Sequence, residues 1–499
     1  MSKTMSKTNR VVLLIHASNF SQPQPKVDAF PWGVLHLAGG LKRAGIQSRI
    51  VDLNVEKLTE IHLENVGCVG ISTTSYAVRS ALQAARLVRT VNPSIPIIWG
   101  GVHPTLDPQN TIQHPLVDFV FRGEGDDVFP DLCELILDGK SYASFPGLLK
   151  KEDSLKKCPL AMISDLDTLP AIPYELLKLS RYNEKILEVH TGRGCPYRCG
   201  FCYNAQKKYR SKSTERILED LCRGRGIFPN ARILVFNDDQ LFSSLTKVQE
   251  ICVMLLQNGI NLPWVANCRI EDIARMDQSF FQILRQSGCS LLKAGVESGS
   301  EKIQKLIGKG NITPEMVREV VVRCRDNQIG LKLNFMIGFP TETIEDLQAT
   351  GKLIADCIHL NPKIERIAVG VYDPYPGTPM WNLALKEGYE APRILEEWGQ
   401  WRGELSRLKW LSCSEQTIIR NFLFLTIPFD KPYVNTVSGL WSRQPMNSPL
   451  WKIWEKFIRF DFLWRSEKGW FRCVPERYFY EQFYSRVGIT SPLLKEMKK

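Results

Sequence analysis

The chain has 499 residues, which is too long for one ordinary domain and predicts two to four. Hydrophobic residues make up 44% and charged residues 23%, values that exclude a disordered, collagenous or coiled-coil chain. The net charge of +11 permits acidic ligands but does not by itself indicate nucleic acid, and we expect no nucleic-acid partner.

The apolar runs and the cysteines of the sequence indicate the cellular compartment of the protein. No apolar run approaches the roughly 18 residues that span a bilayer. The apolar stretch after the basic N-terminus, residues 11–15, is shorter than the roughly 7–15 residues of a secretory signal. The 14 cysteines are mostly scattered, which indicates reduced thiols rather than a disulfide framework. We therefore expect a cytoplasmic protein.

Residues 1–145 alternate apolar runs with helical patterns. Strands are expected near residues 11–15, 48–53, 68–72, 96–101 and 118–125, and helices near 33–43 and 76–91. Uniformly apolar strands between helices indicate a doubly wound, flavodoxin-like domain with a parallel sheet. Ligands of such domains bind beyond the carboxyl ends of the strands. The loops there supply small and polar candidates for ligand binding: Ser72, Thr73, Thr74, Gly100, Gly101, Gly123, Glu124 and Gly125.

The rest of the chain divides into three stretches. Residues 146–182 are rich in charge and proline and predict an extended linker. Residues 183–395 repeat strand and helix, with strands expected near 187–190, 233–236, 264–267, 291–296, 331–338 and 366–371. Six such units suit a partial TIM-type barrel. Residues 396–499 predict a mostly helical, aromatic-rich C-terminal domain. Within it, residues 451–464 form a helix that could touch a membrane or line a substrate pocket; we favour packing over the barrel mouth.

A cysteine-rich loop follows the first strand of the expected barrel. The sequence GRGCPYRCGFCYN places Cys195, Cys199 and Cys202 within eight residues. Thiolates hold zinc or iron–sulfur clusters, and three of them can bind three irons of a cubane while the fourth iron stays open to substrate. The spacing leaves three alternatives: an iron–sulfur cluster, a zinc site with a fourth ligand from elsewhere, or a chance grouping.

The CxxxCxxC spacing resembles that of the radical S-adenosylmethionine (SAM) superfamily, and Phe201 supplies the aromatic residue before the last cysteine. Further segments resemble that superfamily in the expected order: FNDDQLF (236–242), AGVESGSEKI (294–303), FMIGFPTET (335–343) and YPGTP (375–379). The segments PWGVLHLAGGLKRAG, WGGVHPT, RGEGDD and DLDTLPAIP resemble the cobalamin-binding members. The resemblance covers roughly residues 10–380.

The resemblance implies a 4Fe-4S cluster, SAM and cobalamin as cofactors. Catalysis and cluster binding would fall to Cys195, Cys199 and Cys202. The implied SAM-contacting residues are Phe201, Tyr203, Asp238, Asp239, Arg269, Glu297, Ser298, Gly338 and Pro340. Each aspartate could instead cap a helix, and Arg269 could form a surface ion pair. The DxHxxG signature that supplies a cobalt ligand is absent, and His16, the one histidine near that loop, has the wrong spacing; a vestigial domain is the alternative.

The function that the resemblance implies is methylation of an unactivated carbon through a 5′-deoxyadenosyl radical and methylcobalamin. The substrate would be a small molecule, lipid or peptide, and a flavodoxin or ferredoxin would donate electrons. Two alternatives stay open: an oxidative cyclase resembling the anaerobic magnesium-protoporphyrin monomethyl ester cyclases, and a non-catalytic zinc-binding protein. The remaining cysteines in helix and strand patterns are expected in the core, namely Cys222, Cys252, Cys289, Cys324 and Cys357.

Overall fold

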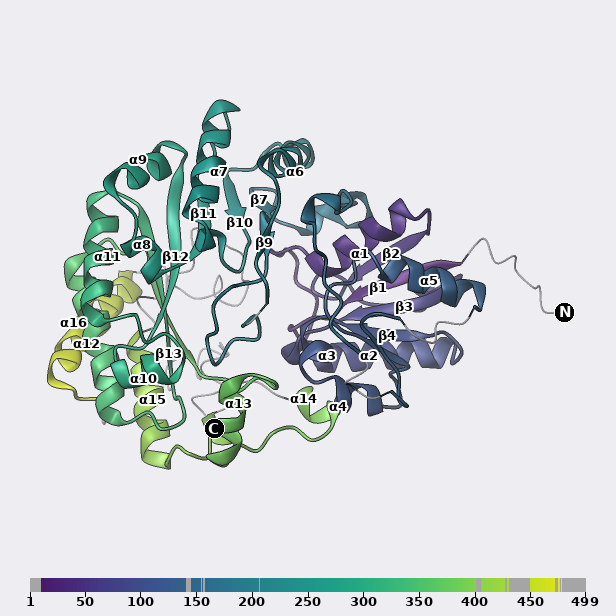
Figure 1. Cartoon of the computed structure of the whole chain (residues 1–499). Helices are drawn as coiled ribbons and strands as arrows, with labels where there is room; N and C mark the ends of the chain where they lie inside the picture. Colours follow the sequence, from purple (N-terminus) through teal and green to yellow (C-terminus); the bar gives the residue numbers. More distant parts are fainter. Residues whose placement is uncertain are drawn as a thin grey trace. The chain divides into compact units, whose positions relative to one another are not determined.

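A computed structural model of the chain describes residues 10–140, 145–153, 155, 158–205, 207–400, 405–426, 429, 449–471, 474, 475 and 477. The chain folds into two compact units (Figure 1). The first consists of Met1–Glu184 and Ala391–Arg402, and the second of Lys185–Glu390 and Gly403–Lys499. Where the functional domains begin and end stays a prediction.

The first unit is a doubly wound α/β fold. Its six-stranded sheet has the order β2-β1-β3-β4-β5-β6, and the strands are β1 (Val11–His16), β2 (Ser48–Asp52), β3 (Val66–Ser72), β4 (Ile97–Gly100), β5 (Phe119–Phe121) and β6 (Leu148–Leu149). All neighbours pair in parallel except β5 and β6. The helices are α1 (Trp32–Arg43), α2 (Val78–Val91), α3 (Val102–Leu106), α4 (Pro108–Gln113) and α5 (Phe129–Asp138). The expected fold is confirmed, and the strand order reverses between β1 and β3, where such folds bind ligands.

Residues 146–182 pack within this first unit. They contribute β6 to the sheet and a small hydrophobic cluster of Ile163, Leu166 and Leu169. The Tyr182 hydroxyl donates a hydrogen bond to the buried Asp52 carboxylate at 2.7 Å. The 3-10 turns of the unit are η2 (Glu60–Leu63), η3 (Ser75–Ala77), η5 (Leu166–Thr168), η6 (Tyr174–Leu176) and η7 (Leu179–Arg181). The segment expected as an extended linker is therefore part of the unit's packing.

A short segment from much later in the sequence also belongs to the first unit. Its helix α14 (Leu395–Trp398) packs on α2. His114 Nε2 lies 2.8 Å from Glu396 Oε1, and the Trp398 ring meets the His103 ring edge-on at 5.0 Å between centroids. These contacts fix the segment to α2, α3 and α4.

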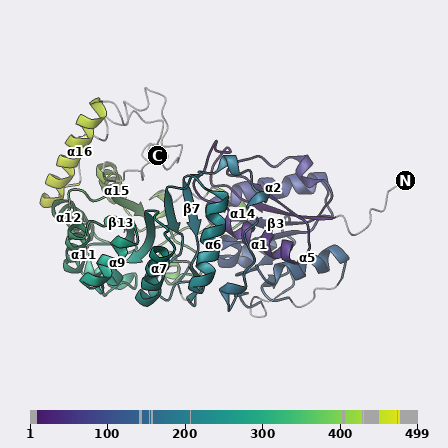
Figure 2. The same cartoon turned by 90° about the horizontal axis from the view of Figure 1, so that it is seen from above.

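The second unit is an open parallel barrel (Figure 2). Its sheet has the order β14-β13-β12-β11-β10-β7, with strands β7 (Ile186–Val189), β10 (Ile233–Phe236), β11 (Trp264–Arg269), β12 (Cys289–Glu297), β13 (Gly330–Ile337) and β14 (Arg366–Val371). The helices between and after the strands are α6 (Thr214–Ile227), α7 (Leu245–Gln257), α8 (Ile270–Ala274), α9 (Gln278–Gln286), α10 (Glu301–Leu306), α11 (Pro314–Asp326), α12 (Ile344–Leu360) and α13 (Pro379–Lys386). Since each strand lies beside its predecessor, the expected partial (β/α)6 barrel is confirmed.

Smaller elements complete the second unit. They are the antiparallel ribbon of β8 (Gly192–Arg193) and β9 (Arg210–Ser211), the turns η8 (Leu241–Ser243) and η9 (Leu405–Arg407), and the helices α15 (Cys413–Thr426) and α16 (Pro449–Lys468). Helix α16 packs on α12 and α15 through the buried Ile458 and Phe462. Among the described side chains of α16, Phe457 and Phe460 on its outer side are 47% and 69% exposed.

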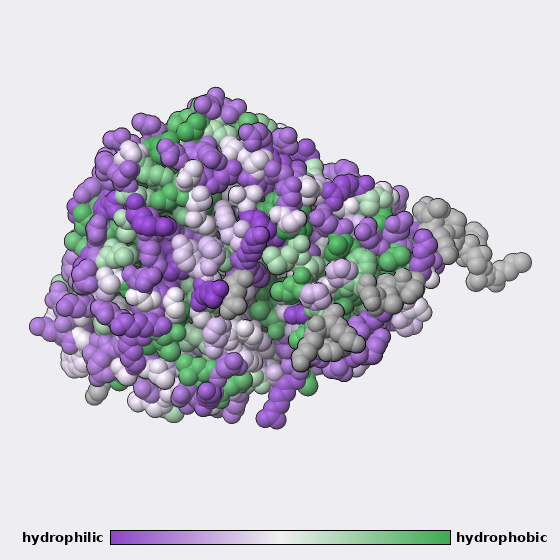
Figure 3. Space-filling view, viewed as in Figure 1, coloured by the Kyte–Doolittle hydropathy of each residue, from purple (hydrophilic) through white to green (hydrophobic). Residues whose placement is uncertain are grey.

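Hydrophilic and hydrophobic residues are interspersed over the face that Figure 3 shows. Among the described residues, no helix has both the length and the apolar character needed to cross a membrane. Four of the five cysteines expected in the core are buried, but Cys222 is exposed, so that expectation is wrong for Cys222. The reason is helical phase: Ile217, Leu221 and Gly224 form the buried side of α6, and Cys222 lies to one side of it.

Candidate active site

The cysteine loop is closed at its base by the β8–β9 ribbon. Gly192 pairs with Ser211, and the Cys195 amide donates a hydrogen bond to the Lys207 carbonyl at 3.1 Å. Gly194 has a φ of +85°, and a Cβ added there would lie 2.4 Å from the Lys208 carbonyl oxygen. Only glycine allows the chain to turn here, which explains the glycine just before the first cysteine.

The tip of the loop is held by two other segments of the unit. The Gly200 amide donates to the Ile307 carbonyl at 2.9 Å, and the Met380 amide donates to the Gly200 carbonyl at 3.0 Å. Ile307 follows α10 directly, and Met380 lies in the first turn of α13. Sequence reasoning missed both residues, because their contribution is a backbone group that carries no residue-specific signal.

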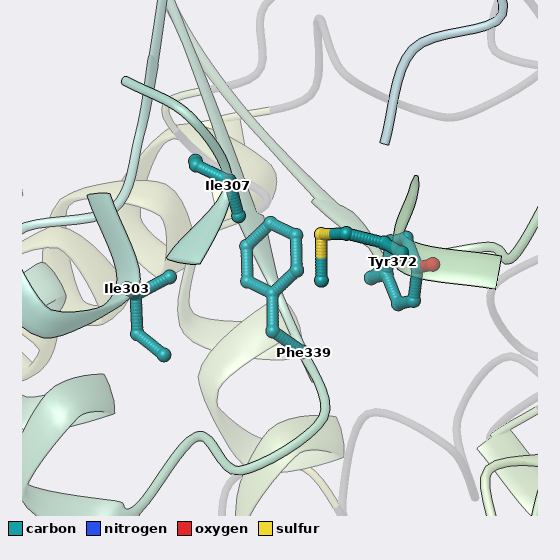
Figure 4. Close-up of a cluster of buried hydrophobic side chains, with 5 residues drawn as sticks. Ile303, Ile307, Phe339 and Tyr372 are labelled. Atoms are coloured by element: carbon teal, nitrogen blue, oxygen red, sulfur yellow. The ribbon is translucent and has the colours of Figure 1, made fainter. Parts of the chain in front are cut away.

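Phe201, expected to contact SAM, packs against a hydrophobic cluster. Figure 4 shows Ile303, Ile307 and Tyr372 around the Phe339 ring, and Met380 completes the buried set. The Phe201 and Phe339 ring centroids are 6.4 Å apart. The aromatic residue between the second and third cysteines therefore anchors the loop to α10 and to the segment after β13.

The three thiols of the loop are partly buried and lie close enough to influence one another. The Asn204 amide donates to Cys202 Sγ at 3.4 Å. Burial, with smaller effects from the other two thiols, raises the pKa of Cys202 to about 11, and burial also raises the pKa of Cys195. Cluster binding must therefore release protons from this loop. Within the described part of the chain, no three His, Cys, Asp or Glu side chains are grouped as they would be around a single metal ion.

Arg269, at the end of β11, connects the loop to the barrel. Its Nη1 donates to Cys199 Sγ at 3.3 Å, and its guanidinium lies 3.9 Å from the centroid of the Tyr197 ring. Glu271 accepts from Nε at 3.2 Å and from Nη2 at 2.5 Å. The ion pair expected as an alternative exists but is largely buried, and the same guanidinium contacts the cysteine loop.

The Asp238 carboxylate binds the two residues that come just before the cysteine loop. Its carboxylate accepts from the Thr191 amide at 2.8 Å, from the Thr191 hydroxyl at 2.6 Å and from the Gly192 amide at 2.8 Å. Burial raises the pKa of Asp238 to about 6, so the group is mostly ionised at neutral pH. Burial also raises the pKa of Asp239, while Lys207 and Asn204 of the loop lower it. Both aspartates thus face the segment that carries the cysteines.

Glu297, the last residue of β12, is held in an unusual conformation. Its φ is +71°, at a point where the β12–β13 register shifts. Lys309 Nζ lies 2.7 Å from Glu297 Oε1 and also donates to the Gly295 carbonyl at 3.0 Å. A Cβ on Gly295 would lie 2.3 Å from Oε1, so glycine is required for this buried ion pair. A strained residue that its surroundings fix this firmly is typical of a functional position.

The remaining expected SAM contacts also have partners within the unit. The Ser298 hydroxyl lies 3.1 Å from the Thr350 hydroxyl. The Gly338 amide donates to Glu342 at 2.5 Å, and its carbonyl accepts from Trp410 Nε1 at 3.2 Å. Pro340 is buried, and Tyr203 lies 6.2 Å from Tyr375 between ring centroids. Which of these residues contact SAM stays a prediction.

In the first unit, the strand-end loops pack closely on one another. The Thr73 amide donates to the Gly100 carbonyl at 3.0 Å, and a Cβ on Gly101 would lie 2.9 Å from the Thr73 backbone. A Cβ on Gly123 would lie only 2.3 Å from the Ala161 carbonyl oxygen, and Glu124 accepts a hydrogen bond from the Ile163 amide at 3.1 Å. The absence of a side chain at these glycines therefore allows the strand-end loops to pack against one another.

The other residues expected at this edge differ in their exposure to solvent. Ser72 and Thr74 are partly exposed, and the Thr74 hydroxyl donates to Asn19 at 3.3 Å, while Gly125 is buried. His16 ends β1 beside them; burial lowers its pKa, and its Nδ1 is buried without a hydrogen-bond partner among the described residues. Small, polar groups and a neutral imidazole at the switch point fit a corrinoid, and the individual contacts stay a prediction.

His103 is a second neutral imidazole in the first unit. Its Nδ1 lies 3.0 Å from the Ser75 hydroxyl, and burial lowers its pKa to about 3. In the unfolded chain this imidazole takes up a proton near pH 6.5, whereas in the folded unit it stays neutral down to about pH 3. The free energy of unfolding is therefore unaffected by this group above pH 6.5 and decreases as the pH falls below that value. We expect this ring alone to lower the free energy of unfolding by roughly 2 kcal/mol between pH 7 and pH 5.

Pulse proteolysis in urea at pH 7 and pH 5, read on peptides of the first unit, measures this loss. His103→Gln should be less stable at pH 7 and should show a shallower loss on acidification. Equal pH dependence in the variant and the wild type would contradict the assignment.

Comparisons with known proteins agree with this architecture. A family model of the B12 binding domain matches residues 24–133, and one of the Radical SAM superfamily matches residues 189–354. The chain is 28% identical over 370 residues to an uncharacterized methyltransferase of Pyrococcus horikoshii, covering 71% of this chain and 78% of that protein. It is 26% identical to the anaerobic magnesium-protoporphyrin IX monomethyl ester cyclase of Rubrivivax gelatinosus, covering 84% and 79%.

The solved structure of the radical SAM methyltransferase TsrM from Kitasatospora setae, with cobalamin and a [4Fe-4S] cluster bound, has the same fold. Its TM-score is 0.64 at 14% identity, covering 92% of this chain and 99% of that one. The fold, the cysteine loop and the matched domains define a radical SAM enzyme with a B12-binding domain. The chain belongs to the cobalamin-binding radical SAM superfamily, and its cofactors are a 4Fe-4S cluster, SAM and cobalamin.

Proposed function

We propose that the chain is a methyltransferase that adds a methyl group to an unactivated carbon of a small-molecule, lipid or peptide substrate. The observation that carries the proposal is the three-thiol loop of the barrel in one chain with a B12-binding domain. The Pyrococcus relative, which is named as a methyltransferase, supports the proposal. When bound, the cluster and SAM supply a 5′-deoxyadenosyl radical, and cobalamin supplies the methyl group.

The chain's own residues bind and orient these groups. Cys195, Cys199 and Cys202 would hold the cluster, and Arg269 donates a charge-assisted hydrogen bond to the Cys199 sulfur. Glu297 is fixed by Lys309 through one carboxylate oxygen and can accept from a SAM hydroxyl or ammonium group through the other. Turnover needs a reductant, for which we propose a flavodoxin or ferredoxin. We also propose a cytoplasmic location, because the thirteen cysteines of the described chain are free thiols, as is usual in a reducing compartment.

Isotope tracing tests the function directly. The reconstituted enzyme is incubated anaerobically with a reductant, SAM carrying a labelled methyl group, and a metabolite extract, and products are read by mass spectrometry. We expect both 5′-deoxyadenosine and S-adenosylhomocysteine, and a product that gains the labelled methyl group. The relation to the Rubrivivax cyclase makes oxidative cyclisation the second candidate. Substrate-dependent 5′-deoxyadenosine without S-adenosylhomocysteine would favour the cyclase, and a protein with zinc but no iron would exclude both.

A further inference from the structure

Three basic residues occupy one row of the barrel sheet. Lys293 of β12 is in register with Lys332 of β13, which is in register with Arg366 of β14. Side chains in register in a parallel sheet project from the same face, and alternate residues along a strand project from the other. Leu331 and Leu333, which flank Lys332, are fully buried on the side that the helices cover. The three cations therefore lie on the concave side of the barrel sheet.

Within the part of the chain that the structure describes, residues on this concave side are partly exposed. Burial alternates along β13, where the helix-facing residues are buried and Lys332, Asn334 and Met336 on the other face are partly exposed. Gly370 of β14 lies on the same face as Arg366, and a Cβ added to it would meet no atom within 4 Å. Among the described residues, this face of β13 and β14 is therefore partly exposed from the basic row toward the carboxyl ends of the strands.

The charges of the interior act on one another across the barrel. Glu188 belongs to the edge strand β7, three strands away from β12 in the sheet order. Its carboxylate nevertheless raises the pKa of Lys293, while burial, the larger effect, lowers it. This effect agrees with the sheet register, which places the Lys293 side chain on the concave face. Lys332 and Arg366 also interact with other groups of the chain, which an incoming anion would join or replace.

We propose that Lys293, Lys332 and Arg366 form an anion-binding site inside the barrel that holds a carboxylate or phosphate group of the substrate. The assignment of this anion to the substrate rests on the proposed function. A planar guanidinium can bind an oxyanion in a bidentate manner, and two ammonium groups add point charges beside it. Ala368 and Gly370 continue the same face from Arg366 toward the carboxyl ends of the strands, the direction in which Glu297 lies, so the rest of the substrate would extend that way.

Affinity labelling of the reconstituted holoenzyme with pyridoxal 5′-phosphate tests the site without knowledge of the substrate. The aldehyde forms an imine with a lysine amine, with loss of water, and cyanoborohydride reduces the imine to a stable secondary amine that peptide mass spectrometry locates. We expect Lys293 or Lys332 to be labelled about tenfold faster than Lys352, an exposed lysine on α12. Arg366→Ala should lower this labelling several-fold, whereas the matched surface variant Lys352→Gln should leave it unchanged.

Competing anions identify the ligand chemistry. Protection by inorganic phosphate but not malonate, at equal ionic strength, indicates a phosphate group, and the reverse indicates a carboxylate. The proposal is overturned if the labelling rates of the lysines follow only the solvent exposure of their side chains and neither anion slows the labelling of Lys293 or Lys332. Because the readout is binding rather than methyl transfer, its failure leaves the proposed function untouched, and a failed methylation assay leaves the anion site untouched.

Discussion

Replacing any one of Cys195, Cys199 or Cys202 by alanine should reduce SAM cleavage to background. Each thiol would hold a different iron, so a missing ligand exposes a second iron and the cluster is lost or degraded. Wild-type protein should carry about four irons and four sulfides per chain after anaerobic reconstitution. Iron and sulfide analysis, together with chromatography of 5′-deoxyadenosine, measures both effects.

The matched control is Cys222→Ala. Cys222 is exposed on α6, so its replacement should change neither iron content nor SAM cleavage. The cluster assignment fails if any of the three loop variants cleaves SAM at the wild-type rate. A variant that retains iron but loses cleavage would instead show that its thiol has a role other than holding the cluster.

The strands were the most predictable part of the fold. The expected strands at residues 233–236 and 366–371 coincide with β10 and β14, because short, mostly apolar runs that alternate with helical patterns are typical of the strands of an α/β sheet. The ribbon strands β8 and β9 have two residues each, too few to show a period, and only tertiary pairing defines them. Likewise, β6 is defined only by the antiparallel pairing of Leu148 and Leu149 with β5. The sequence around these two residues does not indicate that pairing.

The candidate site was predictable where chemistry depends on residue type and spacing. The three cysteines meet that condition. Lys309 does not, because its role depends on Glu297 at a positive φ twelve residues earlier and on the missing Cβ of Gly295. Glu271 could have been found, since an acid two residues after Arg269 is a possible partner, but the sequence could not show that the pair is buried against Tyr197.

Asp238→Asn should lower cluster occupancy more than it weakens SAM binding. The wild-type carboxylate accepts three hydrogen bonds from Thr191 and Gly192, which precede the cysteine loop directly. The two backbone amides share Oδ1, so an asparagine oxygen can still accept from both, and the Thr191 hydroxyl can turn to accept from the new NH2 group. What the substitution removes is the negative charge, which makes such hydrogen bonds roughly twice as strong as neutral ones. The base of the loop should therefore loosen, and iron content after reconstitution should fall below the wild-type value.

Two companion variants separate a positioning role from direct contact with SAM. Thr191→Val removes only the hydroxyl donor, so it should reduce iron content in the same direction but less than Asp238→Asn. Asp239→Asn changes the neighbouring carboxylate and leaves these three hydrogen bonds in place, so its iron content should stay near the wild-type value. If Asp238→Asn instead retains a full cluster and loses only SAM affinity, measured by equilibrium dialysis, then Asp238 contacts SAM directly, because loss of a loop anchor cannot weaken SAM binding while the cluster stays intact.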